Sequence, residues 1–388
     1  MDRSPSEMAA LRLLALPALG PRRLRALLNR HDPETVVTAI ERGSVPDESS
    51  VAASLLRDFG AVWRVALRES RRSVDDRSLA RSLGNDRVLL IGDADYPASL
   101  AVDAEAPGVL FARGDLSVLR SRRVAVVGTR HCTEYGRATA TGLGSALTVA
   151  GVAVVSGLAR GVDAAAHRGA LAAFDGSSSP GDDESLGRPV GVVASGLDVV
   201  YPREHGGLWK LVSERGLLLG EAPPGTPPER HRFPLRNRII AALSEVVVVV
   251  ESRASGGSMI TVNEALSRGV PVMAVPGATS TRASDGTNLL LRDGAGVALS
   301  ADDVLDALAL DHHRHEPAID PRPAPGGFDA VVLETLGRDG VAVGDLARRL
   351  FESGDPVVAL AETAMALGRL EATGWVVEHG GWFERRGL

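Results

Sequence analysis

The sequence predicts an α/β protein with a doubly wound, Rossmann-like central sheet, a small N-terminal helical domain and a C-terminal winged helix. Three observations predict this class. Between residues 83 and 310, short apolar runs alternate with Ala- and Leu-rich segments, which is the order of parallel strands and crossover helices. Residues 1–75 carry apolar residues at helical spacing only. Residues 328–388 contain three helix-like segments followed by two strand-like ones.

The composition is that of a globular protein without a membrane segment. The chain has 388 residues, 44% of them hydrophobic and 24% charged, enough for one large core and one or two small domains. It lacks a run of ~18 apolar residues, and acidic residues interrupt its start, where a secretory signal carries positive charge. We therefore expect a cytoplasmic protein with no membrane contact. The single cysteine, Cys132, excludes an internal disulfide and a multi-thiolate zinc site, and fits a small filler in a reducing compartment.

The positive charge is almost entirely arginine. Of 43 basic residues only Lys210 is a lysine, and the net charge is −6. A guanidinium can make two hydrogen bonds to a phosphate and can stack on a base. Because the chain as a whole is acidic, an anionic ligand must bind to a local patch. The G-x-x-x-x-G-K-[ST] loop of ATPases is absent, and no Schiff-base lysine is evident.

The N-terminal domain, residues 1–75, is predicted to be helical, with a core that includes Leu11, Leu14, Leu24, Leu27 and Leu28. The segment LPALGPRRLRALL has a Pro and Gly break between two helices, as in a helix-hairpin-helix or SAM-like domain. In that case the arginines after the break stand where they would contact a phosphate backbone: Arg22, Arg23 and Arg25. An ordinary helical turn is the alternative interpretation.

The central domain is predicted to span residues 83–310 and to begin with a short strand, RVLLIGD, at Arg87. From Arg122 onward the expected strands lie at 124–127, 152–155, 190–194, 217–220, 245–251, 271–275 and 296–299. Right-handed crossovers place the loop after each strand at one edge of the sheet. In open α/β sheets that edge binds ligands.

Two segments break this alternation. Residues 175–188, DGSSSPGDDESLGR, are acidic and rich in Ser and Gly, so we expect a mobile insertion in a surface loop. Residues 311–327 are rich in Pro and predict a linker. The histidines of this linker, His312, His313 and His315, have no acidic or thiol partners at regular spacing, so we expect no metal site.

Residues 328–388 predict a winged helix. FDAVVLETL, VGDLARRL and ALAETAMALGRLEATG are the expected helices, and WVVEHGGWFER is the expected two-stranded wing with a Gly-Gly turn. This segment has 6 Arg against 10 Asp and Glu, and its presumed recognition helix offers only Arg369 against Glu362 and Glu371. An acidic module is poorly suited to duplex phosphates, so contact with a protein is favoured over a transcription regulator.

Five loops rich in Gly, Ser, Thr and Arg follow the predicted strands. They are Gly128–Arg130, SGLARGVD from Ser156, ERHRFPLRNR from Glu229, ESRASGGS from Glu251 and PGATSTRASDGTN from Pro276. Small residues let a ligand approach backbone amides, and helix N-termini favour anions. The arginines among these loops include Arg130, Arg160, Arg236, Arg238 and Arg253. The pattern predicts a phosphate-binding edge.

Single-stranded DNA fits such an edge. Sequence-tolerant binding of single strands needs cations along the backbone and a flat side chain on which a base stacks. Phe233 supplies the ring, within a cluster formed by Arg230, Arg232, Arg236 and Arg238. Core packing is the alternative role of Phe233.

Signatures of enzymes are weak. GxGxxG is absent after the first parallel strand, so we expect no dinucleotide cofactor. Ser156, Asp163 and His167 suggest a catalytic triad, but the G-x-S-x-G elbow is absent. We expect Asp163 and His167 to cap their helix and to bond the neighbouring loop instead. We therefore expect no catalytic residue, no cofactor and no metal.

Six motifs in this order resemble the DNA-processing protein A family, also called DprA or Smf: VAVVGTR, SGLARGVDAAAHRGAL, SGLDVVYP, FPLRNRIIAALS, VVVESRASGGSMIT and VPGATSTRASDGTN. The resemblance covers roughly Leu83 to Leu310. It implies a protein without known catalytic activity that binds single-stranded DNA, forms a homodimer, protects incoming DNA and helps to load the RecA recombinase in natural transformation.

The resemblance also implies a basic DNA pocket that includes Arg130 and is bordered by Ser156, Gly157, Arg160, Phe233, Asn237 and Arg238. With the other loop residues, the candidate DNA-binding set is Gly128, Thr129, Arg130, Ser156, Gly157, Arg160, Phe233, Arg236, Asn237, Arg238, Arg253, Gly257 and Ser258. The sequence departs from the family pattern at two places. Residues 256–258 are Gly-Gly-Ser where Ser-Gly-Ser is usual, and Gly220 precedes Glu221 where Ser is usual.

One enzymatic alternative shares this kind of fold. Nucleotide phosphoribohydrolases use a Gly-Gly-x-Gly-Thr loop and a downstream glutamate, which GGSMITVNE with Glu264 imitates only loosely, because the Gly-Thr pair is missing.

Overall fold

The computed structural model describes residues 3–28, 31–44, 51–73, 76–175, 185–310, 325–336, 341–351, 356–379 and 381–385. The chain divides into two compact units, Met1–Asp311 and His312–Leu388. Most of the predicted insertion, residues 176–184, and of the predicted linker, residues 311–324 with all three histidines, lies outside the described residues. No helix in the described ranges is long and apolar enough to cross a membrane.

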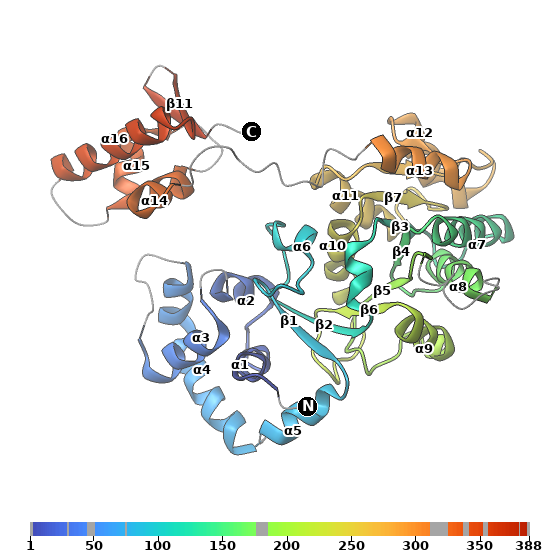
Figure 1. Cartoon of the computed structure of the whole chain (residues 1–388), viewed down its shortest axis with the longest axis horizontal. Coiled ribbons are helices and arrows are strands. Elements are labelled where there is room, and N and C mark those ends of the chain that lie inside the picture. Colours follow the sequence, from blue (N-terminus) through green and yellow to red (C-terminus); the bar gives the residue numbers. More distant parts are fainter. Residues whose placement is uncertain are drawn as a thin grey trace. The chain divides into compact units, whose positions relative to one another are not determined.

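Five helices precede the sheet: α1 (Pro5–Leu14), α2 (Pro21–Leu28), α3 (Pro33–Arg42), α4 (Val51–Ser73) and α5 (Asp76–Leu83). Ser4 starts α1 with a capping box that it forms with Glu7. Of the predicted core leucines, Leu14 is half-buried and the other four are buried. Trp63 of α4 donates to the Pro17 carbonyl at 2.9 Å, which fixes the connection between α1 and α2. Figure 1 shows these helices gathered beside the first two strands, with which they share a core.

The central sheet has nine strands. They are β1 (Arg87–Leu90), β2 (Val109–Gly114), β3 (Arg123–Val127), β4 (Ala153–Ser156), β5 (Val190–Val193), β6 (Leu217–Gly220), β7 (Val246–Val249), β8 (Val272–Ala274) and β9 (Gly296–Val297), in the spatial order β1-β2-β6-β5-β4-β3-β7-β8-β9. The seven strands from β3 to β9 pair in parallel, whereas β2 pairs antiparallel with both β1 and β6. The predicted α/β class with a mostly parallel sheet is confirmed. An antiparallel end, formed by the predicted strand β1 and by β2, which was not predicted, extends the parallel strands expected from Arg122 onward.

Helices cover both faces of the sheet (Figure 1). They are α6 (Ala98–Ala101), α7 (Glu134–Val149), α8 (Val162–Asp175), α9 (Gly206–Arg215), α10 (Arg232–Leu243), α11 (Ser258–Ser267), α12 (Asp285–Arg292) and α13 (Ala301–Leu310). Alternate residues of β3 point to opposite faces. Val124 and Val126 pack with residues of α7, α8 and α13, whereas Ala125 and Val127 pack with residues of α10 and α11. The central strand is therefore buried on both sides, and only its ends are open to a ligand.

The second unit has its own core. Helices α14 (Gly327–Leu336), α15 (Val343–Leu350) and α16 (Pro356–Ala372) pack around Leu336, Leu346 and Leu367. A three-stranded antiparallel sheet completes it in the order β10 (Val341–Ala342), β12 (Trp382–Arg385), β11 (Val376–His379). Strands β11 and β12 were predicted, and the two-residue β10 was not.

Candidate nucleic-acid interface

The strand order reverses beside β3, because β4, β5 and β6 lie on one side of it and β7, β8 and β9 on the other. In open α/β sheets, such a reversal opens a crevice beyond the carboxyl ends of the two strands that flank it, here β3 and β7. Gly128 follows β3 at this point. A Cβ atom on Gly128 would lie 2.6 Å from Val162 Cγ2 and 2.8 Å from the Glu251 carbonyl oxygen, so only glycine fits here.

The buried carboxylate of Glu251 fixes the turn after β3. Thr129 N–H donates to the Glu251 carbonyl oxygen at 2.7 Å, and Thr133 N–H donates to Glu251 Oε2 at 2.8 Å. The Thr133 hydroxyl donates to the same carboxylate and accepts from Gly136 N–H at 3.1 Å, which caps α7. The loops after β3 and β7 are thus joined into one rigid edge, from which Arg130 projects into solvent.

Three side chains meet at this edge, two from loops and one from the first turn of α10, and we call them the Arg130 platform: Arg130, Tyr201 and Phe233. The Arg130 guanidinium carbon lies 4.9 Å from the centre of the Phe233 ring. The Tyr201 ring lies 5.5 Å from the Phe233 ring, tilted by 57°. Phe233 is half-buried, and Tyr201 and Arg130 are exposed. A cation stacked on one face of exposed rings leaves both charge and flat apolar surface open to a ligand.

The sequence singled out Arg130 and Phe233 but missed Tyr201. Tyr201 could have been predicted from its place in the loop after β5, because that loop lies at the same edge of the sheet as the other loops. The expectation that Arg230, Arg232, Arg236 and Arg238 surround Phe233 needs correction, because the guanidinium over the ring comes from Arg130. Arg232 pairs instead with Glu229, at 3.1 Å.

Arg160 is exposed beside this platform but is paired. Its Nε donates to Glu204, and about half of each side chain is accessible to solvent. The hydrogen bond from Arg160 lowers the pKa of the Glu204 carboxyl. A phosphate that binds Arg160 must therefore displace a carboxylate.

Arg236, an expected phosphate ligand, is buried, and this expectation needs correction. Its Nη1 donates to the Val192 carbonyl oxygen, and a Cβ atom on Gly157 would lie 2.0 Å from that nitrogen. Burial lowers the Arg236 pKa to about 10, while the charge of Asp163 opposes this shift. Arg236 therefore packs under the loop after β4, against Gly157, and stabilises that loop from inside the protein.

Arg238 is also buried and internally paired. It donates to the Glu105 carbonyl oxygen and to Glu221 Oε2, each at 2.6 Å. Two expected hydroxyl ligands are likewise engaged inside the protein: Ser156 donates to the Val126 carbonyl oxygen at 2.7 Å, and Ser258 donates to Ser252 Oγ at 2.8 Å. Desolvation and these partners remove all three side chains from direct contact with a ligand.

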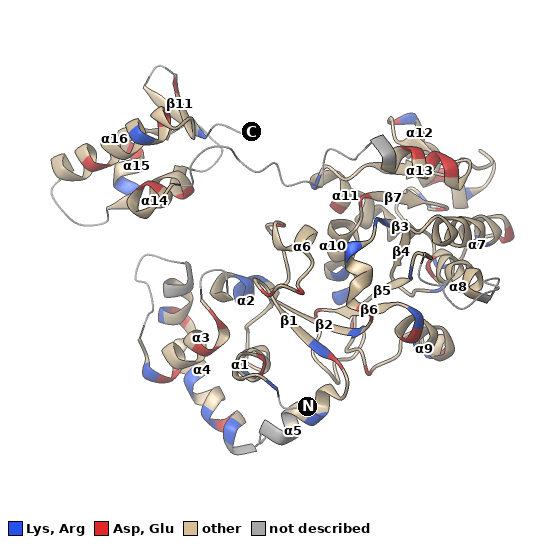
Figure 2. Cartoon of the chain, viewed as in Figure 1, with Lys and Arg blue, Asp and Glu red and all other residues tan. Residues whose placement is uncertain are grey.

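Of the remaining candidates, Gly157 is buried and its N–H donates to Asp163 at 3.1 Å, whereas the other five are open or partly open. Arg253 and Gly257 are exposed, Thr129 and Gly128 are partly exposed, and Asn237 is half-buried. Gly257 precedes α11, and a Cβ atom there would meet no neighbour within 4 Å. Arg230, Arg253 and Arg282 are exposed, and their side chains show no hydrogen bond or ion pair within the described part of the chain. Figure 2 shows basic residues on α10 and acidic ones concentrated on α13.

Asp163 bonds the neighbouring loop as expected, but His167 makes no hydrogen bond from its ring among the described residues, so its expected bond to that loop needs correction. Asp163 lies in the first turn of α8 and accepts a hydrogen bond from Gly157 N–H at 3.1 Å. His167 is fully buried one turn later, and burial lowers its pKa to about 4. Cys132 is half-buried, as expected of a filler.

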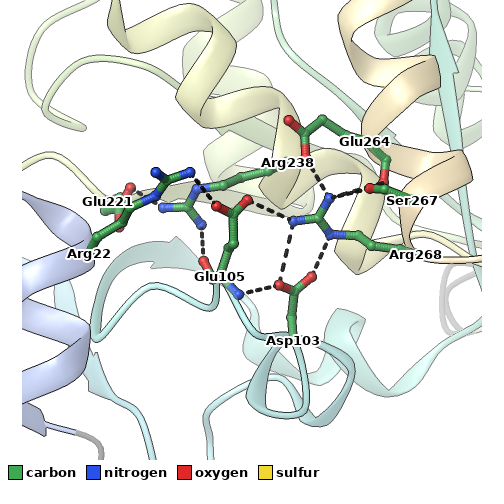
Figure 3. Close-up of polar contacts among 8 residues, drawn as sticks. All are labelled: Arg22, Asp103, Glu105, Glu221, Arg238, Glu264, Ser267 and Arg268. Carbon is green, nitrogen blue, oxygen red and sulfur yellow. Dashed lines mark hydrogen bonds and ion pairs between the residues drawn. The ribbon is translucent and has the colours of Figure 1, made fainter. Parts of the chain in front are cut away.

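A network of ion pairs and hydrogen bonds anchors the helices α2, α10 and α11 to the connection between β1 and β2 (Figure 3). Its centre is Glu105, whose carboxylate accepts from Arg22 of α2 at 2.6 Å and from Arg268 at 3.4 Å. Arg268 also pairs with Asp103 and with Glu264, each at 2.5 Å. The connection between β1 and β2 thereby holds α2 and the C-terminal end of α11, and the Glu105 carbonyl oxygen holds α10 through Arg238.

The network changes the interpretation of two earlier candidates. Arg22, predicted to contact a phosphate backbone, is paired with Glu105, and Arg23 donates to the Ala18 carbonyl oxygen at 2.7 Å and covers the Phe59 ring at 4.5 Å. Arg25 is half-buried. Glu264, the glutamate of the phosphoribohydrolase alternative, is bound by Arg268. Among the described residues, no group of three or more His, Cys, Asp or Glu is arranged to hold a metal ion.

The chain matches the model of the family described as DNA recombination-mediator protein A over residues 87–309. It is 37% identical to the DNA processing protein DprA of Bacillus subtilis over 219 residues, which are 56% of this chain and 70% of that protein. The crystal structure of DprA from Streptococcus pneumoniae superposes with a TM-score of 0.63 at 29% identity and covers 79% of this chain and 98% of that one. A structure of DprA from Helicobacter pylori, which concerns its single-stranded DNA binding mode, superposes with a TM-score of 0.51 at 27% identity and covers 60% of this chain and 99% of that one.

Proposed function

The chain belongs to the DNA recombination-mediator protein A family and is a DNA-processing recombination mediator of transformation, and on that premise we propose that its carboxyl-edge crevice binds single-stranded DNA. The Arg130 platform is the observation that carries this proposal. An exposed guanidinium held over one aromatic ring, with a second ring beside it, offers a phosphate contact and a stacking surface within one nucleotide's reach.

The chemistry of the edge favours binding over catalysis. Three acidic side chains that would serve a reaction are engaged in the fold: Glu251 caps the turn, Asp163 holds the loop after β4, and Glu264 pairs with Arg268. We therefore propose that the chain acts without catalytic activity. Incubation with nucleoside monophosphates followed by a search for free base tests this directly, and release of base at a useful turnover would contradict it.

The finer assignments follow from the family resemblance. We propose that the chain protects incoming DNA, forms a homodimer and delivers its DNA to the RecA recombinase. We also propose that the second unit is a winged helix that contacts protein. In support, Arg369, the basic residue of α16 closest to a recognition role, is held by Asp329 at 2.6 Å and 2.9 Å, which leaves it poorly placed for duplex phosphates.

A salt-titrated comparison of single- and double-stranded DNA of equal length tests the proposal. We expect tighter binding to the single strand, with little dependence on sequence. The affinity should fall with salt with a log-log slope of ~0.7 per neutralised phosphate. Equal affinity for a blunt duplex, or a flat response to salt, would overturn the assignment of the crevice.

A further inference from the structure

A second hollow lies at the carboxyl edge, along the face of α10 next to the one that carries Phe233 of the Arg130 platform. It has a volume of about 180 Å³ and lies between the turn that connects α1 with α2 and the ends of β5 and β6. Its lining includes Gly20, Leu24, Val193, Glu221, Arg236 and Ile239. We call it the hairpin pocket.

The size of the hairpin pocket limits its ligand. Pockets for drug-sized molecules and cofactors have volumes of roughly 300–1,000 Å³. A volume of about 180 Å³ is equivalent to about six waters at ~30 Å³ each, which suits one heterocyclic ring but not a whole nucleotide.

The lining of the pocket is mixed, and a free acceptor oxygen between apolar walls suits a base. Leu24, Val193 and Ile239 supply apolar walls for the faces of a ring. Glu221 is bound by Arg238 through Oε2 only, so Oε1 can still accept a hydrogen bond. Arg236, which is 6% exposed, has an Nε atom without a partner among the described residues. A carboxylate oxygen accepts a hydrogen bond from the amino group of cytosine.

Helix α10 connects the pocket to the platform. Arg232, Leu235, Arg236 and Ile239 follow the spacing i, i+3, i+4, i+7, so they share the face of α10 that lines the pocket. Phe233 lies on the adjacent flank of the same first turn, against Arg130. A strand that crosses the start of α10 can therefore stack one base on Phe233 and present a neighbouring base to the pocket.

We propose that the hairpin pocket takes up one nucleobase of the bound single strand and favours a base with an exocyclic amino group, cytosine among the pyrimidines, through Glu221. This inference rests on the proposed binding of single-stranded DNA. The preference concerns one base position for each bound chain, so it adds a modest bias to binding that is otherwise tolerant of sequence.

Gly20 provides a variant that fills the pocket. A Cβ atom at Gly20 would meet nothing within 4 Å, and its backbone is not in the left-handed region, so Gly20→Leu is expected to fold. Gly142→Leu is the matched control, because Gly142 also has open space around it but lies within α7, away from the carboxyl edge. Glu221→Gln is a second, independent variant that removes the charge of the acceptor and keeps an oxygen for Arg238.

The experiment measures the affinities of the full chain for dC20 and dT20 at one salt concentration. We expect the wild type and Gly142→Leu to bind dC20 about fivefold more tightly than dT20. Gly20→Leu and Glu221→Gln should bind both with equal affinity. Equal binding of dC20 and dT20 by the wild type, or a preference that survives both pocket variants, would overturn the pocket. Absence of binding to either oligonucleotide would instead overturn the proposed function.

Discussion

Arg130 is the residue on which DNA binding should depend most directly. It follows β3 at the reversal of strand order, it is exposed, and its guanidinium is held by the ring of Phe233. We expect Arg130→Ala to lower the affinity for single-stranded DNA by about 1–3 kcal/mol, as for a charge-assisted hydrogen bond, with the thermal midpoint nearly unchanged. Arg130→Lys should restore only part of the loss, because an ammonium makes neither the bidentate contact nor the planar stack.

Arg120→Ala is the internal control for this substitution. Arg120 is exposed, like Arg130, but precedes β3 and so lies at the opposite edge of the sheet. Its removal lowers the charge by the same amount. If both alanine variants weaken binding equally, the effect is one of net charge and the crevice is not the site.

His167 predicts how stability depends on pH. Burial lowers its pKa from about 6.5 to about 4, so the folded state binds its proton only at lower pH than the unfolded state does. The stability from His167 is complete above pH 6.5 and is lost as the pH falls from 6.5 to 4, by up to about 3 kcal/mol. Urea unfolding at a series of pH values should show this loss. His167→Gln should reduce it, and an unchanged pH dependence in that variant would show that His167 titrates normally.

The buried arginines Arg236 and Arg238 show that residue type alone does not predict whether an arginine is exposed or buried. A sequence does not distinguish an arginine that faces solvent from one whose burial is compensated by partners distant in the chain. Arg238 is bonded to Glu105, 133 positions away, and Arg236 is bonded to Val192, 44 positions away. Arg130 could be placed because its position depends only on the strand before it. Tyr201 was missed because its motif, SGLDVVYP, contains no arginine and was not among the five loops rich in Gly, Ser, Thr and Arg.

Helix α10 carries residues of the Arg130 platform, of the hairpin pocket and of the ion-pair network. Its first turn carries Phe233 and one wall of the hairpin pocket, and Arg238 in its second turn binds Glu221 and the connection between β1 and β2. Burial raises the pKa of the Glu221 carboxyl, and the charge of Arg238 opposes that shift. The ion pair between Arg238 and Glu221 therefore helps to fix the position of α10, and with it the position of Phe233 in the platform.

Arg238→Ala should destabilise the first unit strongly. Removal of one partner of a buried pair leaves Glu221 uncompensated, a cost of about 3–5 kcal/mol. Denaturant unfolding measures it. Arg292→Ala is the control, because Arg292 pairs with Asp293 at 3.0 Å in solvent, where such pairs contribute about 0–1 kcal/mol. Equal unfolding midpoints for the two variants would show that the Arg238 pair does not stabilise α10.

Six of the strands that the sequence predicted share a physical origin. β3, β4, β5, β6, β7 and β8 are covered on both faces, so each is a run of consecutive apolar residues that stands out locally. β2 is equally buried, but its place depends on antiparallel pairing with β6, more than 100 residues later, which no local pattern reveals. β10 has only two residues and exists because it pairs with β12.

At the scale of the whole molecule, the chain keeps its cores separate. The buried residues of the second unit form a cluster that includes no residue of the first. All five loops of the carboxyl edge, the platform and the hairpin pocket belong to the first unit. Residues 328–388 carry more acidic than basic side chains, so they add negative charge to the chain.

Truncation after Asp311 should therefore leave single-stranded DNA binding largely intact. The division between the units falls at this residue, so the cut exposes no core of the first unit. It also removes a net acidic segment, whose repulsion of phosphates falls off within about 10 Å at 0.1 M salt. We expect the truncated and full chains to bind with affinities that differ by less than tenfold and to show the same salt slope. A larger loss on truncation would place part of the binding surface in the second unit, because the first unit has lost nothing else.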